Sequence, residues 1–365
     1  MTYLIAIAGI VALIILHELG HFMAAKAVGM RVERFSLFFG PLLVKFRRGE
    51  TEYGIGPIPL GGYVKITGMN PNEDIPEEIR PRAYYRQPVW KRVVVILAGP
   101  AMNLLLAFLI LTGLVLSQGA VVTSHGQAVA ARTVAAGTLI APASKYLKAG
   151  DEIVAVDGRR RLTVDQISKA ISSHHCAGTE KAGCRATTPV SITVRRHGTL
   201  DTFTMYPRYD ASLKKTRIGF GFANEIRRYG VVGAAGQGLS TMWYVTHETL
   251  SRIAKIFESK DRKQLHGIVG ITDEAHQAVA DGPAVALGVL ALISLSLAII
   301  NLFPFLPLDG GHVFWALAEK VRGRPIPFSV MERAGVVGFV LVLIIGFIGL
   351  SNDISSLTGS GLTLR

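Results

Sequence analysis

Four long apolar segments constrain the fold of this 365-residue chain more than any other feature. Residues 93–116, 283–303 and 334–350 carry no charge, and a fourth apolar segment starts at residue 2 and resumes after residue 21. A bilayer core about 30 Å thick needs about 20 helical residues, so each segment is long enough to cross it once. The sequence therefore predicts a polytopic α-helical membrane protein with four transmembrane helices, over residues 1–30, 93–116, 283–308 and 328–350.

The composition agrees with a membrane protein and argues against two other classes. Half of the residues are hydrophobic, which excludes a disordered chain, and only 18% are charged, against about 25% in an average soluble protein. The net charge of +13 fits either nucleic acid or anionic lipid as a partner. Because of the hydrophobic excess, we expect the lipid bilayer as a partner and no nucleic acid.

The distribution of Lys and Arg predicts the orientation of the chain in the membrane. Residues 26–92 hold 12 of these basic residues, and the short segment 309–327 holds three more. The positive-inside rule places both segments in the cytoplasm, so both termini, including the tail 351–365, and the long segment 117–282 lie outside. We therefore expect a multi-pass protein of the inner (plasma) membrane. The first three residues are not basic, which disfavours a cleaved signal peptide.

Residues 120–208 are expected to form a soluble α/β domain inserted between the second and third membrane helices. Strand patterns at 153–156 and 190–194 flank a helix pattern over 163–172. The stretch 147–158 resembles the helix, strand and turn of PDZ domains, which bind a peptide along an open sheet edge. A peptide C-terminus is therefore a candidate partner. The alternative is an α/β module that only separates the membrane segments.

Two features of the outer segment have more than one interpretation. Cys176 and Cys184 would lie on the oxidising side of the membrane, and they fit either a disulfide or two free thiols. Residues 209–282 are expected to be a linker that contains an amphipathic helix over 239–257. Such a helix either lies in the membrane interface or packs under the outer domain.

The pentapeptide His17-Glu18-Leu19-Gly20-His21 interrupts the first apolar segment. Two histidines four residues apart project from one face of a helix and can hold one zinc ion, with the intervening Glu18 beside it. Ionisable groups inside a membrane helix are costly and usually functional. The alternative is a polar cluster whose members satisfy one another between helices.

Zinc-dependent hydrolysis needs three protein ligands and one open position, so a third ligand is expected from another segment at membrane depth. Asp309 follows an apolar run that is broken by Pro304 and Pro307, and the unwound helix end would free its carboxylate to turn inward. His312 is a chemically suitable rival, although a position facing cytoplasmic water suits it better. The sequence therefore favours Asp309.

The motifs of this chain resemble those of the site-2 proteases, specifically the bacterial regulator-of-sigma-E protease type with a single PDZ domain. The similarity covers almost the whole chain, and its motifs keep their order. They are His17-Glu18-x-x-His21, Gly99-Pro100-x-x-Asn103, Asn301-x-x-Pro304 and Leu308-Asp309-Gly310, together with residues 56–65, which match a membrane-associated β-hairpin within the cytoplasmic loop 31–92. Many relatives have two PDZ domains, whereas this outer segment has room for one.

The resemblance implies a site as well as a family. It implies Zn²⁺ as the cofactor, held by His17, His21 and Asp309, with Glu18 as general base and Asn301 helping to hold the substrate backbone. For Asn103, a helix-packing contact is an alternative to a role in the site.

The expected strand over residues 59–66 could pair with the backbone of a substrate helix that has been locally unwound. Gly61 and Gly62 leave room for close approach, and with Tyr63 they are the expected substrate-binding residues of this strand. The alternative is an ordinary cytoplasmic hairpin.

The predicted function is intramembrane zinc proteolysis. By resemblance, the substrates are transmembrane segments of single-span membrane proteins already trimmed on the outside, such as anti-sigma factors or signal-peptide remnants. One alternative is a non-catalytic membrane scaffold that binds C-termini through the PDZ-like domain. Another is a metal transporter, which the almost wholly apolar second and fourth membrane segments disfavour.

Overall fold

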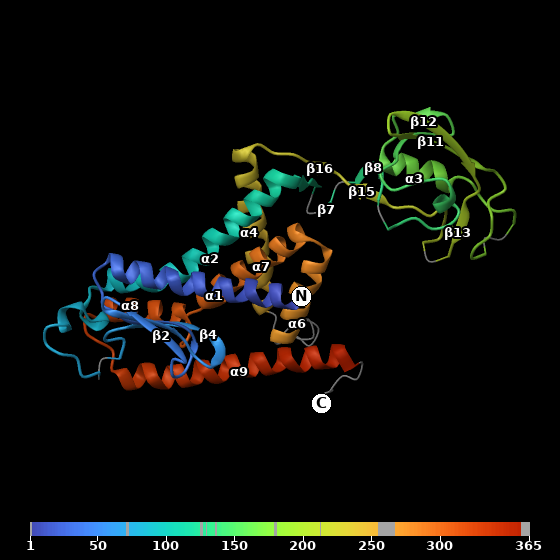
Figure 1. Ribbon diagram of the computed structural model, residues 1–365. Coiled ribbons are helices and arrows are strands. Elements are labelled where there is room, and N and C mark those ends of the chain that lie inside the picture. The colour runs from blue at the N-terminus through green and yellow to red at the C-terminus, as the bar shows by residue number, and fades with distance from the viewer. Residues whose placement is uncertain are drawn as a thin grey trace. The chain divides into compact units, whose positions relative to one another are not determined.

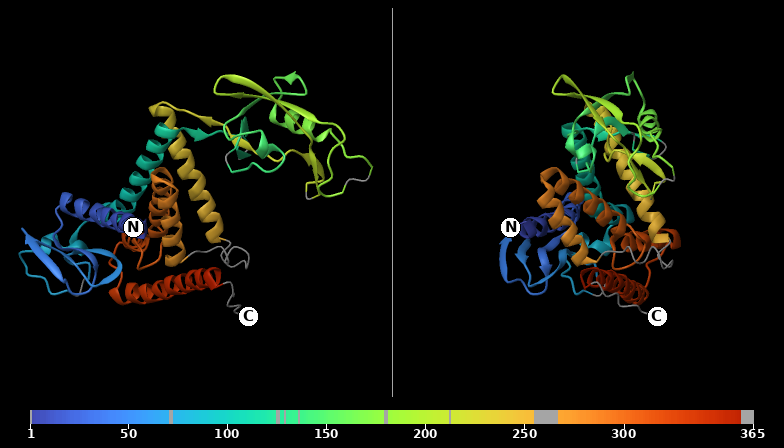
Figure 2. Two further views of the ribbon diagram at one scale, coloured as in Figure 1. Left: turned by 45° about the vertical axis from the view of Figure 1, so that its right-hand side comes forward. Right: turned by 90° about the vertical axis from the view of Figure 1, so that its right-hand side faces the viewer.

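The computed structural model describes residues 2–358, apart from residues 71–72, 125–126, 129, 136, 179–180, 212 and 255–266. The chain divides into two compact units, one of residues 1–117 and 230–365 and the other of residues 118–229. Figures 1 and 2 show that long helices dominate the first unit and that strands dominate the second. Each unit has a hydrophobic core of its own.

Four helices among the described residues are long and apolar enough to cross a membrane, which confirms that prediction. They are α1 (Thr2–Ala27), α2 (Val89–Gln118), α7 (Pro283–Asn301) and α9 (Phe328–Thr358). In lipid, each backbone N–H and C=O must be bonded within the protein, and an unbroken helix achieves this. Only 11% of the apolar window of α9 is buried inside the protein, so most of its apolar surface is free to face lipid.

The helix boundaries correct the prediction at the third and fourth membrane segments. α7 ends at Asn301 rather than at residue 308, because the prolines that follow cannot continue a helix. Residues 309–327 are not a loop, because most of them form α8 (Asp309–Arg322), which ends at Gly323 in the left-handed conformation. α9 continues past residue 350 to Thr358, and the rest of the expected tail lies outside the described residues.

The expected loop 31–92 forms a four-stranded sheet rather than a hairpin alone. Its strands lie in the order β2-β3-β1-β4, with β1 parallel to β3 and antiparallel to β4. β4 is one edge of this sheet and lies beside α1. The elements are β1 (Val32–Phe39), β2 (Val44–Arg48), β3 (Thr51–Ile55) and β4 (Ile58–Ile66), followed by 3-10 helices at Arg80–Arg82 and Tyr84–Arg86.

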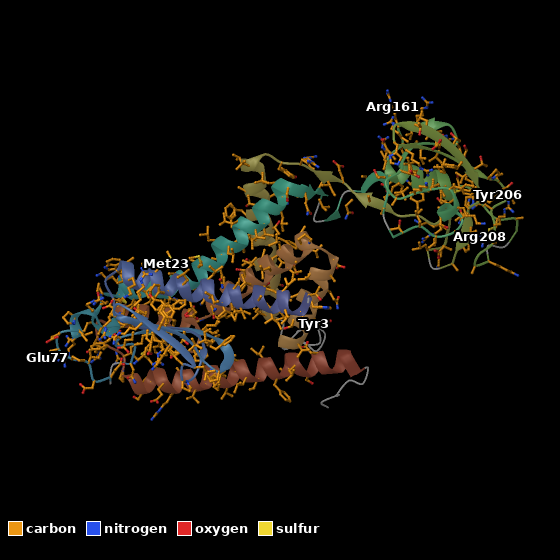
Figure 3. All side chains as sticks on the ribbon, viewed as in Figure 1. Tyr3, Met23, Glu77, Arg161, Tyr206 and Arg208 are labelled. Atoms are coloured by element: carbon orange, nitrogen blue, oxygen red, sulfur yellow. A yellow bond between two sulfur atoms is a disulfide. The ribbon has the colours of Figure 1, made fainter. Side chains whose placement is uncertain are left out.

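Two further helices of the first unit lie in the segment expected to be a linker. α4 (Val231–Ala254) starts before the expected helix 239–257, whose last three residues lie outside the described part. It packs against α7, with Met242 against a hydrophobic core of the first unit. α6 (Ile268–Asp281) packs against α1 and α7. The ring of Tyr3 at the start of α1, labelled in Figure 3, stacks on His276 of α6.

The second unit is built on a sheet with strand order β12-β11-β9-β8-β15, and β10 pairs with β9. α3 (Val164–Ser172) begins with a capping box in which Thr163 and Gln166 bond each other's backbone N–H groups. Its Ile167 and Ile171 join the core. The main strands are β8 (Ala130–Val134), β9 (Glu152–Val156), β10 (Arg159–Arg160), β11 (Val190–Arg196), β12 (Thr199–Met205) and β15 (Phe222–Asn224).

The second unit extends beyond the expected domain boundary at residue 208. β15 pairs with β8, so residues 209–229 complete this unit and are not part of a linker. Because β8 and β15 are far apart in sequence, no local pattern predicts that they pair. The minor elements are β5 (Ala120–Val121), β6 (Thr123–Ser124), β7 (Gln127–Ala128), β13 (Arg208–Asp210), β14 (Lys215–Arg217), β16 (Ile226–Arg227) and a 3-10 helix at Ala143–Lys145.

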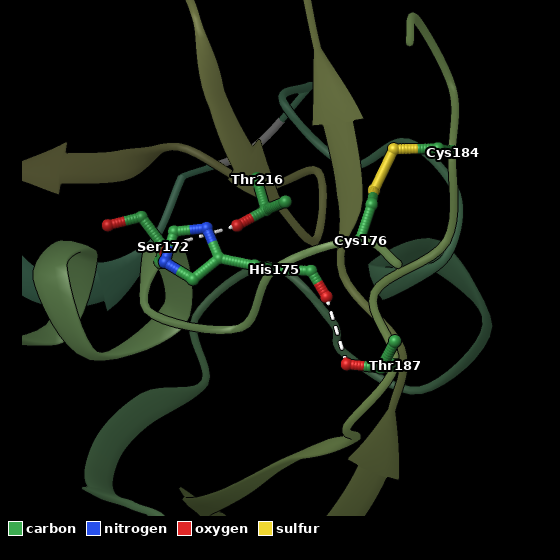
Figure 4. The surroundings of a disulfide bond; sticks show 6 residues. All are labelled: Ser172, His175, Cys176, Cys184, Thr187 and Thr216. Atoms are coloured by element: carbon green, nitrogen blue, oxygen red, sulfur yellow. Dashed lines mark hydrogen bonds between the residues drawn. A yellow bond between two sulfur atoms is a disulfide. The ribbon is translucent and has the colours of Figure 1, made fainter. Parts of the chain in front are cut away.

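Cys176 and Cys184 form a disulfide, which decides between the two interpretations of this pair. Figure 4 shows the bridge closing the segment between α3 and β11. The hydroxyl of Thr187 donates to the carbonyl of His175 at 3.1 Å, next to the bridge. The hydroxyl of Thr216 donates to Ser172 at the end of α3, also at 3.1 Å. The disulfide joins the two ends of this segment, and hydrogen bonds hold the chain beside it.

Candidate metal centre

His17 and His21 of α1 meet Asp309 at the start of α8, although nearly 300 residues separate them in sequence. Asp309 Oδ2 lies 3.1 Å from His17 Nε2 and 3.3 Å from His21 Nε2, and the two Nε2 atoms are 3.2 Å apart. Both histidines are buried, and Asp309 is partly buried. Among the described residues, these three form the group able to hold a metal ion.

The spacing of these three atoms fits a tetrahedral zinc ion. Zinc lies about 2.0–2.1 Å from histidine nitrogen and carboxylate oxygen, so two ligand atoms of a regular tetrahedron are about 3.3 Å apart. The three observed separations, 3.1, 3.2 and 3.3 Å, describe one face of such a tetrahedron. Two nitrogens and one oxygen also form a ligand set that zinc favours, and three ligands leave a fourth position open.

Glycines allow α2 to pack closely against α1 beside the candidate metal centre. A Cβ atom at Gly20 of α1 would overlap the backbone carbonyl of Ala98, and one at Gly99 of α2 would overlap the imidazole of His21. The crossing therefore requires glycine on both helices. His21 Nδ1 lies 2.9 Å from the carbonyl oxygen of Val95, so its Nδ1–H can donate to α2 while Nε2 faces the other two candidate ligands.

The chain between α7 and α8 folds tightly to present Asp309. A Cβ atom at Gly310 or Gly311 would overlap backbone atoms of this connection, at Leu302 and at Phe305. The approach of α9 to Leu306 likewise depends on glycine, at Gly338. The carboxylate lies in the first turn of α8, where the positive end of the helix dipole favours an anion.

A buried ion pair fixes α8 against α2. The guanidinium of Arg92, at the start of α2, donates to Glu319 Oε2 at 2.9 Å and to Glu319 Oε1 at 2.7 Å. Arg92 is 8% exposed, so both bonds lie largely away from water. Neither residue belongs to a motif of the sequence. A charged residue at the start of an apolar helix was the available signal, but it did not identify the partner more than 200 positions away.

Glu18 lies between the two candidate histidine ligands in the sequence of α1 and next to the sheet edge at Gly62. Its carboxylate interacts electrostatically with both histidines and with Asp309. On β4, a Cβ atom at Gly62 would lie only 2.9 Å from Glu18 Cγ, so this strand crosses α1 at the residue expected to be the base. The neighbouring Gly61 has φ of +118°, a conformation that favours glycine.

The remaining expected site residues, Tyr63, Asn301 and His312, are not members of the candidate ligand group. The side chain of Tyr63 is engaged elsewhere in the sheet: its hydroxyl accepts a bond from Arg34 at 2.9 Å, and its ring stacks on Phe39. Tyr63 is partly exposed, so its substrate-binding role stays a prediction. Asn301 is the last residue of α7 and is partly exposed. His312, the rival third ligand, lies in the first turn of α8 but is not a member of the ligand group.

Comparison with known proteins agrees with this geometry. The profile of peptidase family M50 matches residues 5–345. A provisionally named zinc metalloprotease of Rhizobium meliloti is 30% identical, over 95% of this chain and 94% of its own length. Another, of Mesorhizobium japonicum, is 32% identical over 92% and 94%. The zinc metalloprotease Rip1 of Mycobacterium tuberculosis is 30% identical over 91% of both chains.

Proposed function

Because the chain belongs to peptidase family M50, the site-2 proteases, and is a zinc metalloprotease with membrane-spanning helices, we propose that it cleaves transmembrane segments of single-span membrane proteins. The observation that carries this proposal is the group of His17, His21 and Asp309, which lies on a membrane-spanning helix and on the helix after another one. A site of this kind suits a substrate that enters from the lipid.

We assign the zinc ligands to His17 Nε2, His21 Nε2 and Asp309 Oδ2. When bound, zinc acidifies the attacking water and polarises the scissile carbonyl. Glu18 takes the proton from that water and passes it to the leaving amine, because its carboxylate lies beside the ligands without being one of them. The imidazoles are held by α2, so the ligand atoms stay converged before substrate arrives.

The free edge of β4 is the proposed docking strand for substrate. A transmembrane helix has its carbonyls bonded internally, so it must unwind locally before attack. An edge strand offers unpaired N–H and C=O groups to such an extended segment. β4 supports this role because its Gly62 packs against Glu18, which places the edge beside the proposed base. In this proposal, Asn301 holds the substrate backbone from the other side.

We place the catalytic centre near the cytoplasmic face of the inner membrane. The basic segments that contain the sheet and α8 support this orientation, with both termini outside. The second unit then lies outside the cell membrane, where its disulfide is stable.

The second unit is proposed to act as a PDZ-like gate for substrates already trimmed on the outside. A cavity of about 390 Å³ lies between α3 and the segment 215–222, next to the edge strand β15. Ile171 and Phe222 give it apolar walls, and Lys215 supplies positive charge at its lining. These features suit an extended peptide ending in a carboxylate. Anti-sigma factors and signal-peptide remnants are substrates of this kind.

Replacing Glu18 by Gln tests the proposal. The purified Glu18→Gln protein should keep its zinc and should still bind a reconstituted single-span substrate, but it should not cleave it. Cleavage at the wild-type rate would refute the assignment of Glu18. Loss of substrate binding with intact zinc would mean that the carboxylate serves docking instead of proton transfer. A purely non-catalytic scaffold would show no cleavage by the wild-type chain either.

A further inference from the structure

Asn103 of α2 is fully buried beside the candidate metal centre and has one unsatisfied atom. Its Nδ2 lies 3.2 Å from His17 Nδ1, while its Oδ1 is buried with no hydrogen-bond partner. Its backbone carbonyl accepts a bond from the hydroxyl of Ser294 on α7 at 2.9 Å. The residue is therefore anchored, but a carbonyl oxygen left unpaired in the interior is costly.

If His17 binds a metal ion, it requires a hydrogen-bond acceptor at the place that the amide nitrogen of Asn103 occupies. Its Nε2 faces Asp309 and His21, so Nε2 is the atom available to a metal ion. A neutral imidazole that binds a cation through Nε2 carries its proton on Nδ1 and donates from there. An amide NH₂ group cannot accept that bond, whereas an amide oxygen can. A half-turn of the amide exchanges the two groups at little steric cost, because they have nearly the same size.

From these two observations we infer that Asn103 Oδ1 accepts a hydrogen bond from His17 Nδ1–H in the zinc-bound protein. This bond satisfies the unpaired oxygen and selects the tautomer of His17 that leaves Nε2 free. His21 has the same arrangement, because its Nδ1 faces the carbonyl of Val95 at 2.9 Å. Both proposed histidine ligands thus donate to oxygens of α2. Asn103 is a positioning residue that acts through His17.

Helix packing alone does not account for Asn103. An apolar side chain of similar size would fill the same space without burying an unpaired oxygen. Partners that hold the second nitrogen of a metal-binding histidine fix its orientation, and their loss weakens metal binding by about 10- to 100-fold. The inference rests on the proposed ligand set, because it has no meaning unless His17 binds the metal.

Three variants of the full-length protein in detergent test this inference. Asn103→Asp keeps an acceptor of nearly the same shape, and Asn103→Leu removes it. Thr112→Val is the matched control, because it removes another buried polar atom of α2 away from the ligand group. Zinc affinity is measured by competition with a chromophoric chelator. The visible absorption of the Co²⁺-substituted protein gives a second readout, because its bands report ligand geometry.

We expect Asn103→Leu to weaken zinc binding by about 10- to 100-fold and to shift the Co²⁺ bands. Asn103→Asp should bind zinc at least as tightly as the wild type, and Thr112→Val should match it. Wild-type affinity and bands in Asn103→Leu would overturn the inference, as would equal losses in the Asp and Leu variants. His17→Ala distinguishes an error in the role of Asn103 from an error in the ligand set. If this variant kept its zinc, the proposed ligand set itself would be wrong.

Discussion

Gly99 of α2 lies against the imidazole of His21 on α1, so closely that a side chain at position 99 would occupy the space of the ring. The same ring offers Nε2 to the metal centre and Nδ1 to the carbonyl of Val95. The distance between the two helices and the orientation of a proposed zinc ligand are therefore set together. A glycine at position 99 is as much a part of the site as the histidine that it contacts.

Replacing Gly99 by Ala should displace His21 and weaken zinc binding by at least about tenfold, the range seen when the support of a metal-binding histidine is lost. Zinc per chain after dialysis against a chelator measures the effect. Gly113→Ala is the matched control on the same helix, because a Cβ atom there meets nothing within 4 Å. Equal zinc retention by the two variants would mean that α2 does not position His21.

Gly62→Ala should abolish cleavage and leave zinc binding intact. The new methyl group would lie 2.9 Å from Glu18 Cγ and 3.0 Å from the carbonyl oxygen of Ser36, so either the proposed base or the strand must move. The metal ligands do not contact this methyl group, because the nearest atoms belong to Glu18, Ser36 and Ile14. Cleavage of a reconstituted substrate and zinc content are measured on the same preparation. Wild-type cleavage would show that β4 does not border the reacting groups.

Arg92→Met should destabilise the protein, because it leaves the partly buried carboxylate of Glu319 without its partner. Breaking one partner of a buried ion pair costs about 3–5 kcal/mol. The double variant Arg92→Met, Glu319→Met should recover much of that loss. Glu77→Gln is the control, since its 3.6 Å pair with Arg80 is exposed and such pairs contribute about 0–1 kcal/mol. Unfolding in detergent measures all four proteins, and similar losses for Arg92→Met and Glu77→Gln would contradict the account.

The second unit should lose stability in acid through Asp151. The guanidinium of Arg196 donates to both carboxylate oxygens, at 2.8 and 2.6 Å, and holds the pKa of Asp151 below its ordinary value. The folded state therefore binds a proton less readily than the unfolded state does. This stabilisation is complete above the ordinary Asp pKa of about 3.9 and is lost as the pH falls through the lower pKa of the folded protein.

Arg196→Gln should cost about 2 kcal/mol at neutral pH and remove most of that pH dependence. Hydrogen exchange of the amides of β9 and β11, corrected for the intrinsic effect of pH on exchange, is the measurement. Arg160→Gln is the control, because Arg160 is an exposed residue of the same unit. An unchanged acid profile in Arg196→Gln would assign the dependence to other carboxylates.

The membrane segments and the two candidate histidine ligands could be predicted because local patterns encode them. An uncharged run is visible in any window of the sequence, and two histidines four residues apart define a helix face. No local pattern predicts that Asp309 meets the two histidines. That prediction depended on a family resemblance and on the small number of polar groups at membrane depth. α8 was missed because charged residues near its end, among them Glu319 and Lys320, made it read as a basic loop.

The features that could not be predicted from the sequence are contacts between segments that are far apart in the chain. The parallel pairing of β1 with β3 and the pairing of β15 with β8 join segments whose own patterns name no partner. The bond from His21 to the backbone of Val95 has no side-chain signal at all, because any residue at position 95 supplies a carbonyl. The bond from Arg34 to the Tyr63 hydroxyl likewise joins strands that have no shared pattern in the sequence, and it leaves the substrate-binding role of Tyr63 a prediction.

The most direct test of the account is the zinc content of purified wild-type, Glu18→Gln and Asp309→Ala proteins. If His17, His21 and Asp309 hold the ion, the wild type and Glu18→Gln should each carry a single zinc per chain, and Asp309→Ala should lose it on dialysis against a chelator. A full complement of zinc in Asp309→Ala under the same conditions would contradict the proposed metal centre.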